Sequence, residues 1–273
     1  MRSAGVSLGD LEQIVLSHLH WDHHGNLAAV LAAAPGIAVV AHRSAEAGLC
    51  GGEGEQSRQA AFLLDFLRQA GVAEADLALW SARRPEPPFA LDPGRVRWVE
   101  DGDRIQAGGA LWEVLYTPGH SQTEMCLFDR GSGDLMASDH LLPDISANAF
   151  VEAPPPGLAG RPRTLLQYRE HLLRVRALPA DMVYPGHGAP FRGHRALIDR
   201  RFAEQDERCA RIAEALAAGP LTALEVSGAL FPQLRGRAVY LGISEVVGHL
   251  DLMESRGQVA VDGNGGVLRF RLK

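Results

Sequence analysis

The stretch Ser17-His-Leu-His-Trp-Asp-His-His-Gly-Asn26 sets four potential metal ligands within six residues, in the order H-x-H-x-D-H. These ligands are His18, His20, Asp22 and His23. A short apolar, β-branched run precedes them and an alanine-rich run follows from residue 27, which predicts a strand-to-helix loop. Imidazole nitrogens and a carboxylate suit zinc and similar divalent metals. Four of them so close together predict a centre that holds more than one ion.

Three further potential ligands each follow a predicted strand. They are His120 in Thr117-Pro-Gly-His, Asp139 in Ser138-Asp and His187 in Pro185-Gly-His. In both Pro-Gly-His turns the proline restricts the backbone and the glycine allows a close approach. A single histidine in a turn is more often a solvated residue. Because the same arrangement recurs after several strands, the pattern favours one shared metal site.

The composition is that of an ordinary globular protein and excludes several other classes. The 273 residues are 46% hydrophobic and 22% charged, which is enough for one large domain or one domain with a small addition. The net charge of −6 gives no basic surface for nucleic acid or an anionic membrane. The odd number of cysteines, the lack of a leader and the lack of a long apolar run predict a soluble, cytoplasmic protein with reduced thiols.

The remaining pattern predicts how the site is enclosed. Residues 96–99 and 110–116 are predicted strands separated by an acidic turn over residues 100–103. Residues 81–94 and 141–163 are rich in proline and are predicted as loops at the rim of the site. We expect Trp21, which stands between ligands, to pack beneath the metal-binding loop.

The seven potential ligands resemble the metal-binding pattern of the metallo-β-lactamase superfamily over residues 1 to about 195. The resemblance implies an α/β fold, namely an αββα sandwich with a binuclear metal site at one edge. It implies that His18, His20 and His120 hold one ion, that Asp22, His23 and His187 hold the other, and that Asp139 bridges them. Histidine ligands at these positions resemble the glyoxalase II and lactonase branches more than true β-lactamases.

The resemblance also implies an activity. We expect a binuclear metal-dependent hydrolase that cleaves a thioester or lactone through a metal-bridging hydroxide, with zinc as the metal and iron or manganese as alternatives. Asp22 and Asp139 are the expected catalytic residues, and His140 is a candidate for substrate contact. The expected partner is a small-molecule acyl substrate, without nucleic acid or a membrane.

Two features depart from the family pattern. Family members begin with several strands, including a Leu-Ile-Asp-Thr-Gly-like segment, and this chain starts after them. The sandwich is therefore expected to be N-terminally incomplete, and an uncovered sheet edge would favour association, for example as a homodimer. Ser138 stands where the family commonly has glycine.

The last part of the chain, residues 196–273, is predicted to form a small winged-helix-like domain after a catalytic domain over residues 1–195. The pattern predicts helices over residues 194–217, 222–230 and 238–255 and then a hairpin over residues 258–272. Glu245, Asp251 and Glu254 make the third helix poor at contacting phosphates. We therefore expect this domain to pack on the hydrolase and close one side of its cleft.

Other functions stay open from the sequence alone. One is a metal-dependent endoribonuclease of the β-lactamase-like type, which the acidic balance disfavours. Another is a winged-helix regulator that uses the metal site as a sensor. An inactive fragment is the third.

Overall fold

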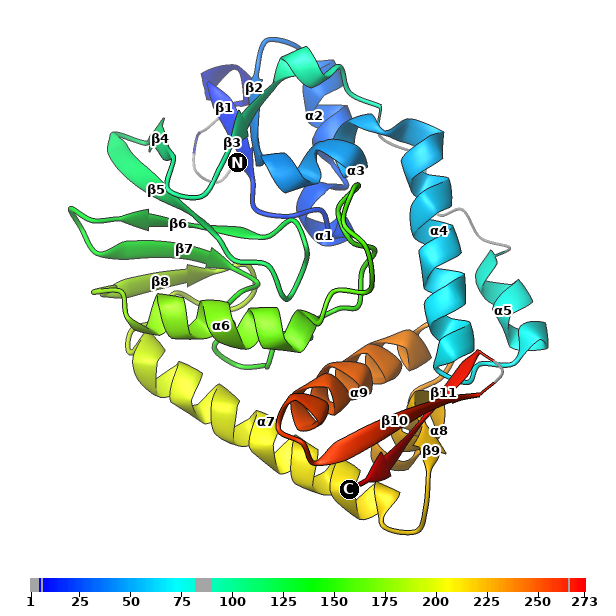
Figure 1. Ribbon diagram of the computed structural model, residues 1–273. Helices are drawn as coiled ribbons and strands as arrows, with labels where there is room; N and C mark the ends of the chain where they lie inside the picture. The colour runs from blue at the N-terminus through cyan, green and yellow to red at the C-terminus, as the bar shows by residue number, and fades with distance from the viewer. Residues whose placement is uncertain (1–4, 6, 82–89, 265) are drawn as a thin grey trace.

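The computed structural model describes residues 5, 7–81, 90–264 and 266–273, and in it two sheets lie face to face between outer helices (Figure 1). The first sheet is parallel and has the order β1-β2-β3. Its strands are β1 (Gln13–Leu16), β2 (Ala38–His42) and β3 (Val96–Val99). The helices that connect them are α1 (Trp21–His24), α2 (Leu27–Ala33), α3 (Glu46–Cys50), α4 (Gly52–Gln69) and α5 (Glu74–Ser81).

The second sheet has the order β4-β5-β6-β7-β8 and is antiparallel except for its last pair. Its strands are β4 (Arg104–Ala107), β5 (Ala110–Tyr116), β6 (Met125–Asp129), β7 (Asp134–Ser138) and β8 (Met182–Pro185). The parallel pair β7 and β8 is joined by α6 (Thr164–Arg176), as a parallel connection requires a crossover.

Alternating burial along the strands produces the layers. In β2, Val39 and Ala41 pack with residues of α2 and α3, whereas Val40 packs between the sheets with Ile105 and Val114. Successive side chains of a strand point to opposite faces, so one strand serves two cores. The other face of the second sheet is covered by α6 and the C-terminal helices. The predicted αββα arrangement is therefore confirmed.

The C-terminal part consists of helices followed by a small sheet. The elements are α7 (His194–Leu216), β9 (Leu221–Thr222), α8 (Ala223–Leu230), α9 (Ala238–Ser255), β10 (Val259–Asn264) and β11 (Val267–Leu272), with sheet order β10-β11-β9. Thr222 caps α8, because its hydroxyl accepts from the backbone of Glu225 while the Glu225 carboxylate accepts from the backbone of Thr222. The helices and hairpin lie where the sequence predicts them.

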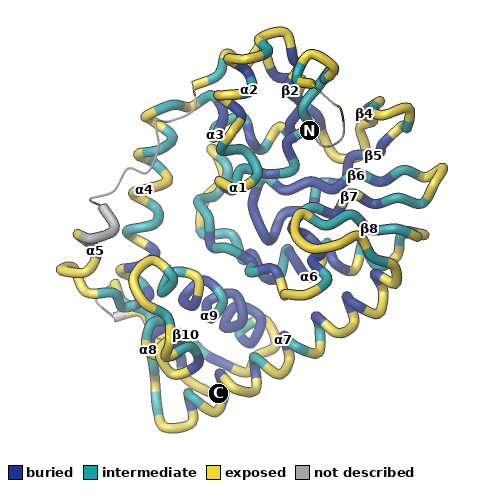
Figure 2. The backbone as a smooth tube through the Cα atoms, turned by 180° about the vertical axis from the view of Figure 1, so that it is seen from behind, coloured by how far each residue is buried: buried dark blue, intermediate teal, exposed yellow. Residues whose placement is uncertain are grey.

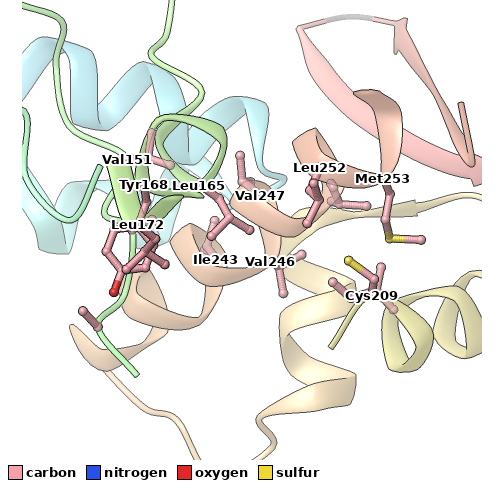
Figure 3. Close-up of a cluster of buried hydrophobic side chains, with 14 of the residues drawn as sticks. Val151, Leu165, Tyr168, Leu172, Cys209, Ile243, Val246, Val247, Leu252 and Met253 are labelled. Atoms are coloured by element: carbon pink, nitrogen blue, oxygen red, sulfur yellow. The ribbon is translucent and has the colours of Figure 1, made fainter. Parts of the chain in front are cut away.

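Helix α9 is the central element of this part. Most of its residues are buried, and Figure 2 shows it as a dark core surrounded by more exposed helices. Ile243 and Val247 of α9 belong to the same buried cluster as Leu165 and Leu172 of α6 (Figure 3). Gly248 allows this approach, since an added Cβ there would lie 3.0 Å from Cβ of Leu165. One continuous apolar core thus extends from the second sheet into the C-terminal part.

The structure differs from the prediction in the segment before residue 110. The sequence predicts no strand between the acidic turn over residues 100–103 and the strand that begins at residue 110, but the structure has β4 there. Ile105 is the one fully buried side chain of β4, and a single buried residue gives no alternating pattern that the sequence could show. The predicted rim loop over residues 81–94 lies largely outside the described residues. In the described part of the chain, no helix is both long and apolar enough to span a membrane.

Candidate metal centre

All seven predicted ligands lie in segments that follow the carboxyl ends of strands, with Asp22 and His23 in the short helix α1, and they lie close together. Ligand atoms come within 4.8 Å of one another in three sets that share members: His18, His20 and His120; His18, His23 and Asp139; and Asp22, His23 and His187. The loop after β1, the turns after β5 and β8 and the bulged end of β7 supply them. Backbone bonds hold the loops in place, for example Met125 N to Ser17 O at 2.9 Å and Gly186 N to Ser138 O at 2.8 Å.

The buried group consists of His18, His20 and His120, and each ring has one nitrogen fixed by a neighbour. Nε2 of His20 donates to Oε1 of Glu152 at 2.8 Å. Nδ1 of His120 donates to the carbonyl of Asn148 at 2.8 Å. Nδ1 of His18 is hydrogen-bonded to the hydroxyl of Ser17 at 3.2 Å. The other nitrogen of each ring is left for a metal, which is the usual arrangement of metal-binding histidines.

Burial sets the protonation of these rings. Burial, together with the neighbouring His20, lowers the pKa of His120 to about 4, and burial lowers that of His18 in the same direction. Both rings are therefore neutral at pH 7 and carry a free lone pair. Burial alone would lower the pKa of His20, but the hydrogen bond and charge of Glu152 outweigh it and raise that pKa.

The exposed group consists of Asp22, His23 and His187. The side chain of Asp22 is 58% exposed and that of His187 is 49% exposed, and Nε2 of His187 lies 3.1 Å from Oδ2 of Asp22. Nε2 of His23 lies 3.7 Å from the same oxygen. In the described part of the chain, no hydrogen bond fixes Nδ1 of His187. Asp22 and His187 are therefore open to solvent and less constrained than the buried group, whereas the side chain of His23 is only 14% exposed.

Asp139 lies between the two groups. Its Oδ2 is 3.4 Å from Nε2 of His23, 3.5 Å from Nε2 of His120 and 3.6 Å from Nε2 of His187. One carboxylate thus faces a member of the buried group and two members of the exposed group. A bridging ligand between two ions would occupy this position.

The polar atoms at the centre fit metal ions. Nε2 of His18, His23 and His120 and Oδ1 of Asp139 are buried and have no hydrogen-bond partner among the described residues. Leaving buried polar atoms unpaired costs free energy, so such a cluster indicates a site that binds a ligand. Three imidazole nitrogens and a carboxylate oxygen converging on one place are donors that zinc or a similar divalent ion prefers.

Backbone conformation explains the small residues beside the ligands. A Cβ on Gly186 would overlap Oδ1 of Asp139 and lie 2.9 Å from Cε1 of His23. Gly119 has φ of +146°, and a Cβ there would overlap the backbone of Tyr168. Both Pro-Gly-His turns therefore need glycine, as the sequence suggests. Ser138 has φ of 45°, a conformation that favours the glycine common at this position in the family it resembles.

Two acids beside the ligands, the partly buried Glu152 and the buried Glu124, were not found from the sequence. Glu152 accepts hydrogen bonds from His20, from the hydroxyl of Ser121 at 3.0 Å and from the backbone of Gln122 at 2.7 Å. The carboxyl of Glu124 lies 4.0 Å from Nδ1 of His18, and burial raises its pKa. Glu152 lies in a proline-rich loop with no periodic pattern, so only the folded chain reveals its contact.

Two residues named beside the ligands have different surroundings. His140 is fully buried, its ring meets Tyr168 edge to face, and burial lowers its pKa to about 3. Its contact with a substrate stays a prediction. The expectation that Trp21 packs beneath the loop is wrong, because its side chain is 53% exposed. Trp21 begins the short helix α1, and its ring lies against Gly25, where an added Cβ would be 2.7 Å from Cε2 of the indole.

Comparisons with known proteins agree with this geometry. The sequence signature of the Metallo-beta-lactamase superfamily matches residues 1–187. The probable metallo-hydrolase YqjP of Bacillus subtilis (strain 168) is 31% identical over 271 residues, which cover 99% of this chain and 83% of that protein. A solved beta-lactamase domain protein from Burkholderia ambifaria is 26% identical and has a TM-score of 0.78, with 96% of this chain and 75% of that chain covered.

One shorter similarity concerns a protein with a named activity. The acyl-coenzyme A thioesterase MBLAC2 of Gallus gallus is 29% identical over 126 residues. The match covers 46% of this chain and 40% of that protein.

Proposed function

Because the chain belongs to the metallo-β-lactamase superfamily and is a metal-dependent hydrolase, we propose that it binds two divalent ions and cleaves a thioester or a lactone. The observation that carries the proposal is the position of Asp139, whose Oδ2 lies 3.4 to 3.6 Å from histidine nitrogens of both ligand groups. Zinc is the expected metal, with iron or manganese as alternatives, because all the donors are imidazole nitrogens and carboxylate oxygens.

In this proposal the buried group holds one ion through Nε2 of His18, Nδ1 of His20 and Nε2 of His120. Asp22, His23 and His187 hold the other, and Asp139 lies between them. The ions supply the Lewis acidity that lowers the pKa of a water molecule and polarises the substrate carbonyl. Glu152, Asn148 and Ser17 keep the rings of the buried group oriented, so the nitrogens are in place before an ion arrives.

Asp22 and Asp139 are the proposed catalytic residues. Asp22 is exposed beside His187, so its carboxylate can reach a substrate that approaches from solvent. We assign it the orientation of the attacking water and the transfer of a proton to the leaving group. Asp139 is 8% exposed in its side chain and contacts both groups, which suits a fixed bridging role.

An acyl compound is the proposed substrate. The partial similarity to an acyl-coenzyme A thioesterase supports a thioester, and the histidine-rich ligand pattern leaves a lactone as the second candidate. The endoribonuclease and the DNA-binding regulator have less support. The net charge is −6, and helix α9, which would enter the DNA groove in a winged helix, is largely buried against α6, α7 and α8.

The test is a metal-loaded preparation assayed against panels of thioesters and lactones. We expect two ions per chain by elemental analysis and hydrolysis of at least one panel. Asp139→Ala should lower kcat/KM by roughly 10³-fold, since a shared ligand that fixes both ions is removed. Asp199→Asn, a matched control on an exposed carboxylate paired with Arg176, should leave the rate unchanged. If Asp139→Ala kept full hydrolysis, the bridging role would be wrong.

A further inference from the structure

A cavity of about 580 Å³ lies beside the metal centre, and the ligand-bearing loop forms one of its walls. Leu19, Trp21 and His24 line the cavity, whereas the residues between them are predicted ligands. The loop therefore presents one set of side chains to the metals and the other to the cavity. A cavity of this size is typical of small-molecule sites.

The cavity is directly connected to the buried group through Glu152. The Glu152 carboxylate lines the cavity and accepts from Nε2 of His20, whose other ring nitrogen is available to a metal. A single imidazole ring thus separates the cavity wall from the metal position. Trp21, exposed at this wall, precedes the exposed ligand Asp22. The part of the chain from Leu19 to His24 is therefore shared by the metal centre and the cavity wall.

The walls combine apolar side chains with neutral polar ones and four charged groups, most of which are paired. Glu55 and Arg58 form two hydrogen bonds of 2.7 Å, and Arg58 also donates to the carbonyl of Pro154 at 2.9 Å. The Glu152 carboxylate accepts hydrogen bonds from His20 and two further donors. Arg237, just before α9, is exposed and has no carboxylate within 4.0 Å among the described residues. Among the charged side chains of the wall that the structure describes, Arg237 is therefore the one without an oppositely charged partner.

We propose that this cavity holds part of the substrate and that Arg237 binds an anionic group on it, either a carboxylate or a phosphate. The inference rests on the proposed hydrolysis of an acyl ester. Leu19, Ala47 and Pro155 provide an apolar wall for a carbon chain, and a guanidinium binds carboxylate and phosphate oxygens in a fixed fork geometry. The C-terminal part of the chain would then select the substrate, while the loops of the sandwich carry the reaction.

Four thioesters test this assignment and identify the source of the anion. Hexanoyl and adipoyl groups are each attached to N-acetylcysteamine, which is uncharged, and to coenzyme A, which carries phosphates. We expect the wild-type protein to prefer the charged member of at least one pair by kcat/KM. Arg237→Gln should reduce that preference about tenfold, the usual effect of losing one charge-assisted hydrogen bond.

The acyl pair and the thiol pair of these esters distinguish a carboxylate from a phosphate as the anionic group. If Arg237→Gln loses only the preference for adipoyl over hexanoyl esters, the anionic group is a carboxylate on the acyl chain. If it loses only the preference for coenzyme A over N-acetylcysteamine esters, the anionic group is a phosphate. Arg235→Gln is the matched control, because Arg235 lies two residues away and donates to the carbonyls of Pro232 and Leu234. We expect Arg235→Gln to keep the preferences of the wild type. If Arg237→Gln kept them as well, the assignment would be overturned.

A binding measurement separates this inference from the proposed function. If the metal-loaded protein cleaved none of the four esters, the proposed function would fail on thioesters, and binding of adipate and of coenzyme A would then decide about the cavity. Trp21 lines the cavity and is exposed, so its fluorescence should report occupancy, with Trp21→Phe identifying its share of the signal. Binding about tenfold weaker in Arg237→Gln supports the anion site; equal binding, or none, overturns it.

Discussion

The buried and the exposed ligand groups of the metal centre differ in how well they are held. His18 and His120 are 1% and 4% exposed, and every ring of the buried group has one nitrogen fixed by a hydrogen bond. Asp22 and His187 are about half exposed. Among the described residues, the carboxylates within 4.0 Å of Nε2 of His187 are those of Asp22 and Asp139, which belong to the same centre.

This difference has consequences for metal binding. Rings that are already oriented lose little conformational entropy when an ion binds, whereas exposed side chains must be ordered at that moment. The buried group should therefore bind its ion first and more tightly, and the exposed group should bind the second ion more weakly. The weaker ion would lie on the side from which a substrate arrives from solvent.

Removing a ligand of the buried group should have the largest effect. His120→Ala deletes a donor whose Nδ1 is held by Asn148 and leaves Asp139 without one of its neighbours. We expect loss of the tighter ion and a fall in kcat/KM of roughly 10³-fold, since the metal supplies several kcal/mol to the reaction. Elemental analysis and steady-state kinetics measure both. Two tightly bound ions in this variant would refute the ranking of the groups.

Removing a ligand of the exposed group should have a smaller effect. His187→Ala leaves the buried group and its hydrogen bonds intact, so one ion should remain tightly bound while the second is lost at micromolar metal. We expect kcat/KM to fall on the order of 10²-fold, because part of the Lewis acidity remains. Calorimetric titration of the metal-free protein should show one tight site instead of two unequal sites. Loss of both ions would contradict the independence of the groups.

The sequence predicts which side chains gather at the candidate site much better than it predicts the contacts that support them. The seven ligands and the Thr222 cap depend on local spacing, and a short motif carries that information. Glu152 is separated from His20 by 132 residues, and no local pattern marks the pair. Arg237 likewise reaches the cavity only because α9 packs against α6. Contacts of this kind depend on the tertiary arrangement of the whole chain.

The error at Trp21 has a similar origin. A large aromatic residue between ligands suggests a buried support, since tryptophan is highly buried on average. In the structure, α1 is a helix of four residues, and Leu19 and Leu27 on either side of it pack in the apolar cluster of the first sheet. Trp21 is turned outward and towards the cavity. The direction of so short a helix cannot be read from its own residues.

A variant of Glu152 measures how far the hydrogen bonds of the buried group raise its metal affinity above that of the exposed group. Glu152→Gln keeps the shape of the side chain but replaces a charged acceptor of His20 by a neutral one. We expect the affinity of the tighter ion to fall about tenfold, with little change in the weaker one, because outer partners orient the ligand and raise its basicity. Competition with a chelator measures each affinity. Glu113→Gln, which loses a remote pair with Arg130, is the control and should change neither affinity.

The smallest effect concerns Ser138, which helps to hold the buried group at the cost of an unfavourable backbone. Its hydroxyl donates to that of Ser17 at 2.8 Å, beside Nδ1 of His18, while its φ of 45° costs about 1 kcal/mol in a residue with a Cβ. Ser138→Ala loses the hydrogen bond and keeps the strain, whereas Ser138→Gly loses the bond and relieves the strain. The glycine variant should therefore be more stable than the alanine variant by about 1 kcal/mol in urea unfolding. Equal stability of the two variants would mean that the backbone here is not strained, and a weaker tight ion in both would confirm that the hydroxyl orients His18.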